Sequence, residues 1–266
     1  MPPGTGYWGQ QTATIEWCEE NYVVSYYVAE FWNTLSNAVI IFSPLVMLIL
    51  CYTQKYETRF VCTFAAMTVV GIGSVFFHMT LKYNMQLMDE LPMVWANASF
   101  LYSCLMMTSK SNTDNIILQA SLFLGSLAIT VVYVLIEVPL FLQIAYGVMN
   151  TLVILLHIRM VLTMDCNKYL FLCGLGCYLL GFLLWNIDNV YCHQLRYLRK
   201  HTLAESSGML FECHAWWHVF TGIGAYLGIL FTLHTRYVFL QRKPKLKMFL
   251  GFWPYVSLPP VTGKIQ

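Results

Sequence analysis

The chain has 266 residues, of which 58% are hydrophobic, 16% aromatic and only 11% charged, and its mean hydropathy is +0.58. An ordinary soluble domain carries about 25% charged residues. The composition therefore excludes a typical soluble enzyme and indicates a membrane protein. The net charge is only +2, and once the basic residues at the expected membrane boundaries are set aside, no basic surface large enough to bind nucleic acid remains.

Uncharged intervals follow one another along the chain, and each is long enough for a helix to cross roughly 30 Å of hydrocarbon. We therefore expect an all-α membrane protein, a bundle of seven transmembrane helices that forms one domain over residues 31–240. An N-terminal segment, 1–30, precedes this domain, and a tail, 241–266, follows it. The uncharged intervals are 31–54, 60–81, 91–109, 115–136, 138–158, 169–187 and 213–235.

Seven spans place the two termini on opposite faces of the membrane, and the distribution of Lys and Arg indicates which face is cytosolic. The N-terminal face carries Lys82, Arg196, Arg199 and Lys200, whereas the other eleven of the fifteen basic residues lie on the opposite face. We expect a lumenal N-terminus, without a separate signal peptide, and a cytosolic C-terminus. Segment 193–212 is then a polar lumenal loop, and the tail is a basic cytosolic flank.

Three of the nine cysteines, Cys18, Cys192 and Cys213, fall on the lumenal, oxidising face. We expect one disulfide there and prefer the pairing of Cys18 with Cys192, although the sequence does not decide it. The other six cysteines fall in membrane or cytosolic positions, where free thiols are expected. Cys173 and Cys177 are four residues apart, but no His or acidic residue accompanies them at that depth, so we interpret them as helix-packing thiols.

A pair of histidines, His214 and His218, opens the last apolar interval. Residues four apart on a helix lie on one face, which suits two ligands of a single metal ion. Catalytic zinc normally takes three protein ligands, so the pair requires a partner. His78, near the end of the second interval, is the best candidate.

Two further polar residues are expected at the same depth as these histidines. Ser74 lies one helical turn before His78, and Asp89 precedes the third interval. Because successive spans alternate in direction, both should meet the histidine pair on the lumenal side. Ionisable groups in hydrocarbon are costly and tend to mark function, so the sequence predicts an intramembrane metal site. His157 and His234 lie at the opposite, cytosolic ends of their spans and are not expected to join it.

The N-terminal segment carries four of the thirteen acidic residues, Glu16, Glu19, Glu20 and Glu30, and it contains no Lys or Arg. Crowded oxygen ligands without a neutralising basic residue suggest Ca²⁺, and Asn21 would add an amide oxygen. The alternative is an acidic cap on the first helix. The EF-hand pattern is absent.

Other polar residues inside the spans have less certain roles. In the first span, Asn33, Ser36 and Asn37 share one helical face, which we expect to look into the bundle rather than at lipid. For Asp188 the sequence leaves two interpretations open, a hydrogen-bond anchor between helices or a wall of the site. Tyr146 is a candidate to point its hydroxyl into a cavity between the helices.

Several motifs of the chain match a known family. They are Tyr7-Trp-Gly9, Glu16-Trp-Cys-Glu-Glu-Asn-Tyr22, Ala29-Glu-Phe-Trp-Asn33, Phe77-His-Met-Thr-Leu-Lys-Tyr83, Gln86-Leu-Met-Asp-Glu-Leu-Pro92, Trp185-Asn-Ile-Asp-Asn189 and His214-Ala-Trp-Trp-His218. On these motifs, the chain resembles the alkaline ceramidases, and among them most closely the phytoceramidase-like branch. The resemblance extends from near the N-terminus to the tail.

This resemblance implies a seven-helix intramembrane hydrolase of the endoplasmic reticulum or Golgi, in the superfamily of the adiponectin and progestin receptors. It implies that the enzyme cleaves the amide bond of ceramide to a sphingoid base and a free fatty acid. The implied zinc ligands are His78, His214 and His218, with Ser74 and Asp89 as catalytic residues. The implied calcium ligands are Glu16, the carbonyl of Trp17, Glu19, Asn21 and Glu30. The relatives usually carry Asp at position 16, and the longer Glu keeps the charge.

The residues themselves favour catalysis over the alternatives. Three neutral ligands leave zinc an open fourth position, so that water is activated for attack on the amide carbonyl. Asp89 is expected to orient that water and carry its proton, and Ser74 to donate to the developing oxyanion. We expect calcium to tune the activity from a separate site.

The alternative function is a seven-span lipid-responsive receptor of the adiponectin/progestin receptor type. In such a receptor the metal would be structural or would sense ligand. Structural metal sites usually fill their fourth position with protein, so an acid and a hydroxyl beside an open metal favour chemistry. A transporter is less favoured, because the chain lacks two matching halves with interrupted helices. The expected partners are the membrane and a ceramide-type lipid, and no protein partner is evident.

Overall fold

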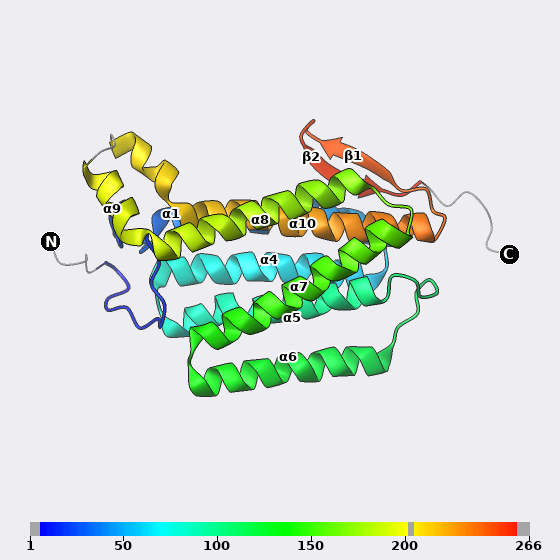
Figure 1. Ribbon diagram of the computed structural model, residues 1–266, viewed down its shortest axis with the longest axis horizontal. Helices are drawn as coiled ribbons and strands as arrows, with labels where there is room; N and C mark the ends of the chain where they lie inside the picture. Colours follow the sequence, from blue (N-terminus) through cyan, green and yellow to red (C-terminus); the bar gives the residue numbers. More distant parts are fainter. Residues whose placement is uncertain (1–5, 202–204, 260–266) are drawn as a thin grey trace.

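The computed structural model describes residues 6–201 and 205–259 of the chain (Figure 1). Within these residues the fold is mostly helical, and the long helices run side by side along the longest axis of the molecule. The segment that precedes the first helix lies at one end, here called the N-terminal end of the bundle. The opposite end, where the last helix stops, is called the C-terminal end.

The first expected span consists of three consecutive helices, α1 (Phe31–Ser36), α2 (Ala38–Phe42) and α3 (Leu45–Thr53). The chain leaves the helix between α2 and α3 at Ser43 and Pro44, because proline has no backbone N–H to donate. The remaining long helices are α4 (Thr58–Thr80), α5 (Tyr83–Leu105), α6 (Ile116–Ile136), α7 (Pro139–Thr163), α8 (Lys168–Val190) and α10 (Cys213–Phe239).

In the described part of the chain, six helical stretches are long and apolar enough to cross a membrane: Phe31–Thr53, α4, α6, α7, α8 and α10. Each coincides with an expected uncharged interval to within a few residues. The remaining interval corresponds to α5, which has 23 residues. Helix α5 is not among the six, because acidic and amide side chains such as Asp89, Glu90 and Asn97 make it more polar. A seventh span therefore stays a prediction.

Glycines allow the helices to approach closely where the buried polar residues lie. A Cβ atom on Gly73 of α4 would overlap the carbonyl oxygen of Met88 on α5. A Cβ on Gly224 of α10 would lie 2.7 Å from the backbone nitrogen of Tyr178 and 2.9 Å from the carbonyl oxygen of Gly174, both on α8. Small residues at such crossings are typical of membrane helix pairs. The contact at Gly73 brings Ser74 next to the start of α5.

A buried ionic cluster, here called the Arg236 cluster, joins α4 to α10 at the C-terminal end. Arg236 is fully buried, and its guanidinium donates to both carboxylate oxygens of Glu57, at 2.8 and 3.0 Å. Arg59 donates to the same carboxylate at 2.6 Å. Burial acts to raise the pKa of Glu57, but the hydrogen bonds from the two arginines outweigh it and lower the pKa overall. From the sequence, both arginines were expected only as basic residues of the cytosolic face, and the cluster was not predicted.

Two segments differ from expectation. Segment 193–212, expected as a loop, contains the helix α9 (Cys192–His201) and the 3₁₀ helix η1 (Glu205–Phe211). The expected basic tail contains an antiparallel hairpin of β1 (Lys245–Phe249) and β2 (Trp253–Ser257), so the all-α expectation is wrong there. A short helix and a two-stranded hairpin are only marginally stable by themselves, so both depend on packing against the rest of the chain.

Candidate active site

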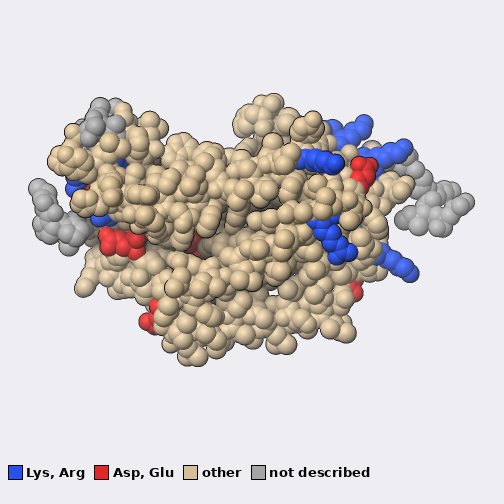
Figure 2. Space-filling model, viewed as in Figure 1, with Lys and Arg blue, Asp and Glu red and all other residues tan. Residues whose placement is uncertain are grey.

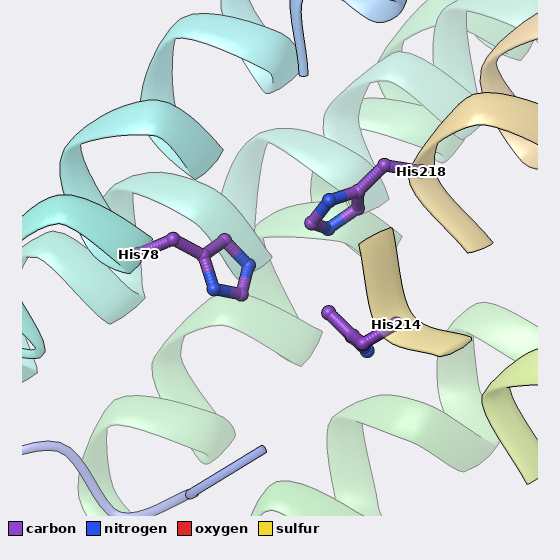
Figure 3. Close-up of side chains that lie close together, drawn as sticks. All are labelled: His78, His214 and His218. Atoms are coloured by element: carbon purple, nitrogen blue, oxygen red, sulfur yellow. The ribbon is translucent and has the colours of Figure 1, made fainter. Parts of the chain in front are cut away.

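Three histidines meet at the N-terminal end of the bundle (Figure 3). His78 comes from the last turns of α4, and His214 and His218 come from the first turns of α10. All three are buried, and one ligand nitrogen from each lies within 4.8 Å of the other two. Of the His, Cys, Asp and Glu residues in the described part of the chain, these three form the group close enough to share a metal ion.

The second nitrogen of His78 is held by a carboxylate. His78 Nδ1 lies 2.5 Å from Glu30 Oε2. An ionised carboxylate only accepts, so Nδ1 carries the proton when Glu30 is ionised. The other ring nitrogen, Nε2, is then a lone-pair donor, and it is buried without a hydrogen-bond partner. A carboxylate that orients the far nitrogen of a histidine is the usual support of a metal ligand. The arrangement therefore fits a metal ion.

His218 is oriented in a similar way by the first span. Its Nδ1 lies 2.8 Å from Ser36 Oγ, and the Ser36 hydroxyl donates its one proton to the carbonyl of Asn33 at 3.0 Å. With this bond in place, Ser36 accepts from Nδ1–H, which leaves Nε2 of His218 for a metal. The amide nitrogen of Asn37, 3.4 Å from the same Nδ1, then donates to the carbonyl of Asn33 at 2.9 Å. As the sequence predicts, the polar face of this span looks into the bundle, because Asn33 and Asn37 are fully buried.

Asp188 acts as a hydrogen-bond anchor, one of the two interpretations that the sequence left open. Its Oδ1 accepts from the backbone N–H of His214 at 3.1 Å, and its Oδ2 accepts from the N–H of Cys18 at 3.1 Å. Nearby, a disulfide joins Cys18 to Cys192, the pairing that we preferred from the sequence, and Cys213 is free. These links hold the N-terminal segment against the start of α10, where Trp17 stacks on His214 with ring centroids 3.8 Å apart.

Ser74 and Asp89 face the same cavity as His214 and His218. The cavity has a volume of about 780 Å³, within the range of small-molecule binding sites. Ser74 is buried, and its hydroxyl has no hydrogen-bond partner at normal distance. Asp89 remains partly accessible because it borders the cavity. His78 is not part of the cavity lining, but one of its ring nitrogens lies within 4.8 Å of ligand nitrogens of His214 and His218.

The rest of the cavity is mostly apolar and runs along the bundle as far as His157. Tyr146 lines it, as the sequence suggested, and its hydroxyl lies 3.3 Å from that of Tyr178. His157 binds Thr232 at 2.8 Å and, as expected, does not join the three histidines. A long, mostly apolar cavity that gathers Ser74, Asp89 and two histidines near one end suits a lipid with one reactive polar group.

Glu90 also lines the cavity, next to Asp89. It was not among the site residues expected from the sequence. One of its carboxylate oxygens, Oε2, accepts from Gln86 at 2.9 Å and from the hydroxyl of Tyr133. The signal was present in the sequence, because a second acidic residue beside Asp89 is unusual next to an apolar interval.

Within the N-terminal segment, Glu19 caps the first helix, which is the alternative to calcium binding considered above. Its two carboxylate oxygens accept from the backbone N–H groups of Trp32 and Asn33, both at 2.8 Å. Burial raises the pKa of Glu19 to about 7. Glu16, in contrast, is largely exposed and lies 3.7 Å from Arg196.

Two oxygens of this segment are buried without partners, Oδ1 of Asn21 and Oε1 of Glu30. Burial raises the pKa of Glu30 to about 8, because a buried carboxylate resists ionisation unless a cation lies nearby. A hard cation bound by oxygen would satisfy both atoms. The two acids Glu16 and Glu19 are not gathered with Glu30 as closely as the three histidines are.

The N-terminal segment is not free of basic neighbours, although its sequence contains none. Helix α9 packs over it, so that Arg196 donates to the carbonyl of Trp17 at 3.2 Å and Lys200 pairs with Glu20 at 2.6 Å. Glu30, an expected calcium ligand, contacts His78 directly. Any ion held by Glu30 would therefore be coupled to the three histidines through one carboxylate.

Comparisons with known proteins bear on this site. A family described as Ceramidase matches residues 9–262, which include every site residue named above. Alkaline ceramidase 3 of Mus musculus is 45% identical over 260 residues, covering 96% of both chains. Alkaline ceramidase YPC1 of Saccharomyces cerevisiae is 37% identical over 254 residues, covering 89% of this chain and 80% of the relative. An alkaline ceramidase of Arabidopsis thaliana is 30% identical over 256 residues, covering 96% of both.

Proposed function

This chain belongs to the ceramidase family, and we propose that it is a zinc-dependent intramembrane amidase that hydrolyses ceramide to a sphingoid base and a free fatty acid. The observation that carries the proposal is the lone-pair nitrogen of His78, held by Glu30 and aimed at the two histidines of α10. These histidines open on an apolar cavity that also contains an acid and an unpaired hydroxyl.

Three neutral histidines are one of the ligand sets typical of catalytic zinc. Glu30 and Ser36 fix the tautomers of His78 and His218, so that their Nε2 atoms are the ligands. Zinc bound there would supply a Lewis acid that polarises the amide carbonyl and lowers the pKa of water.

The other residues of the cavity supply the proton transfers and the charge stabilisation. Asp89 accepts the proton of the attacking water and passes it to the amide nitrogen as the C–N bond breaks. Ser74 donates its unpaired hydroxyl to the carbonyl oxygen as negative charge develops there. Trp17 covers His214 by stacking and shields this side of the site from water.

The apolar chamber accounts for the class of substrate. A ceramide-type lipid already resides in the bilayer, so its amide reaches the site between the helices without leaving the apolar phase. The polar residues Asp89, Ser74 and His218 line the chamber near the N-terminal end, and an alkyl chain extends along the remainder towards His157. Burying the chain in such a lining is favourable, by about 0.8 kcal/mol per methylene.

We also propose that Ca²⁺ binds the N-terminal segment through Glu16, the carbonyl of Trp17, Glu19, Asn21 and Glu30. The unpaired oxygens of Asn21 and Glu30 support this assignment. The ion would take no part in the chemistry. It would keep Glu30 ionised and in place, and Glu30 in turn orients His78.

We propose seven spans, with α5 as the third, in the membrane of the endoplasmic reticulum or Golgi. The N-terminal end of the bundle would be lumenal and the C-terminal end cytosolic, as the asymmetry of Lys and Arg supports. Protease protection of epitope tags in sealed microsomes tests this orientation. Added protease should remove a C-terminal tag, and a protected C-terminal tag would reverse the topology.

The activity is tested with the purified full-length protein and ceramides that differ in acyl chain. Release of fatty acid, measured by mass spectrometry at alkaline pH with calcium, should stop after zinc is removed with a chelator and return when zinc is added. If no ceramide is cleaved by protein that contains one zinc ion per chain, the hydrolase proposal fails and the lipid-responsive receptor becomes the better interpretation.

A further inference from the structure

The C-terminal hairpin, residues 245–257, ends in a cluster of large apolar side chains that the protein leaves uncovered. The exposed fractions are 74% for Leu250, 69% for Phe252, 55% for Met248 and 45% for Phe249. Leu250 and Gly251 both have positive φ, 50° and 82°, so a tight turn gathers these side chains at the tip. Four adjacent apolar side chains at one exposed tip indicate an interaction site rather than scattered surface residues.

The hairpin does not extend away from the bundle. It folds back along the last helix, so that its turn lies towards the middle of the molecule (Figure 1). Its base is fixed near the end of the first span, where the backbone N–H of Leu258 donates to Gln54 Oε1 at 2.7 Å. Two residues closer to the turn, the hydroxyl of Tyr56 donates to the carbonyl of Val256 at 2.8 Å.

The tip is fixed much deeper along the spans. Trp253 Nε1 lies 3.4 Å from the carbonyl oxygen of Ser43, and the hydroxyl of Tyr226 donates to the carbonyl of Pro254 at 2.7 Å. A helix rises about 15 Å from Thr53 back to Ser43, and the hydrocarbon layer is about 30 Å thick. The tip is therefore level with the interior of the membrane, not with its surface.

A strand at this depth needs partners for its backbone polar groups. Pro254 has no N–H, and its carbonyl and that of Val256 accept from Tyr226 and Tyr56. Residues two apart in a strand point to the same side, so these groups belong to the edge of β2 that faces the bundle. The bundle thus pairs the inner edge. The outer edge, formed by β1, has no partner in the described part of the bundle, so its N–H and C=O groups need the water and phosphates of the headgroup layer.

The outer strand carries exposed lysines at positions 245 and 247, which alternate with Leu246 and Met248. A lysine stem can lie along apolar surface while its ammonium group reaches the phosphate layer. In the view of Figure 2, many of the exposed Lys and Arg atoms gather at the C-terminal end, beside an uncharged middle section. The positions of the charged residues therefore agree with the depth of the tip: the lysines lie nearer the membrane surface, and the apolar tip lies further inside.

We propose that the C-terminal hairpin inserts its tip into the acyl chains of the leaflet at the C-terminal end of the bundle, with Lys245 and Lys247 at the phospholipid phosphates. The segment expected as a water-exposed tail is then a membrane anchor. The inference rests on the proposal that the bundle spans the membrane, and it is independent of the hydrolase activity.

Spin-label accessibility in liposomes of phosphatidylcholine and phosphatidylserine tests the insertion. A nitroxide is attached at Leu250→Cys in full-length protein whose Cys62, Cys166, Cys173 and Cys177 are replaced by Ala. Collisions with oxygen, which concentrates among acyl chains, should exceed those with a water-soluble nickel chelate. Lys243→Cys, just before β1, should show the opposite preference, and Leu183→Cys on the exposed face of α8, outside the cavity lining, should behave as a lipid-facing site.

A label at Leu250 as accessible to nickel as the label at Lys243 would overturn the proposal. So would a water-exposed label at Leu183, because the bundle would then not span the bilayer. The lysines are tested by the double variant Lys245→Gln/Lys247→Gln. Phosphatidylserine should strengthen nickel exclusion at Leu250 in the unaltered hairpin and should not do so in the double variant. If phosphatidylserine changed nickel exclusion equally in both proteins, the lysines would have no role in the anchor.

Discussion

The two ends of the bundle each bury a cluster of ionisable side chains, and they differ in what those side chains contact. At the C-terminal end, the Arg236 guanidinium donates to Glu57 and to three backbone carbonyls, so its donors have partners. At the N-terminal end, His78 Nε2 and Glu30 Oε1 are equally buried and have none. Buried polar atoms are nearly always paired, so within these two clusters it is the unpaired atoms of His78 and Glu30, rather than burial or charge, that indicate a ligand site.

The largest effect expected in this comparison comes from removing a metal ligand. His218→Ala should abolish zinc binding and ceramide hydrolysis together, because two histidines do not complete the ligand set. The Arg236 cluster, at the other end, should keep the bundle folded. Zinc content and fatty-acid release are measured on the same purified sample, with His234→Ala as the matched control. A His218→Ala protein that retained full zinc and activity would remove this residue from the centre.

The next effect separates chemistry from metal binding. Asp89→Asn keeps the size of the side chain and all three histidines but removes the group that carries the proton. Turnover should fall by about 10²–10⁴-fold, with zinc content unchanged. Asp165→Asn, an exposed acid at the C-terminal end, is the control and should leave turnover unaltered. Unchanged turnover in Asp89→Asn would reduce this residue to a packing role.

A third variant acts on the structural cluster alone. Arg236→Met leaves Glu57 buried with only Arg59, and breaking a buried pair in this way costs about 3–5 kcal/mol. The midpoint of thermal unfolding should fall while zinc content stays the same. Arg159→Met, an exposed arginine on α7, should have little effect. Loss of zinc from folded Arg236→Met protein would contradict the separation of the two ends.

The smallest effect concerns the residue that joins the calcium and zinc proposals. Glu30→Gln still offers an acceptor to His78 but removes the charge. Zinc affinity should weaken by about 10–100-fold, the usual range for such supporting groups, and the calcium response should weaken in parallel. The control is Glu20→Gln, whose partner Lys200 lies at the surface. If Glu30→Gln changed neither metal, the contact with His78 would be structural only.

Much of this description follows from local sequence pattern. The uncharged intervals located the long helical stretches other than α5 to within a few residues, because a membrane span needs a continuous apolar stretch whatever its neighbours are. Helix α5 begins at Tyr83, well before its expected interval 91–109, because Asp89 and Glu90 interrupt the apolar stretch. The four-residue spacing of His214 and His218 placed them on one helical face for the same local reason. Alternation of the spans then brought His78, Ser74 and Asp89 to the correct end of the bundle.

Contacts between distant segments were decided by the tertiary structure alone. Nothing near Glu30 in the sequence indicates its contact with His78, and the choice of role for Asp188 depended on Cys18 and His214, which lie far from it in the chain. The hairpin was missed because two short strands with lysines are not stable by themselves. Their stability comes from contacts with Ser43 and Tyr226, which lie close together only after the first and last spans have packed.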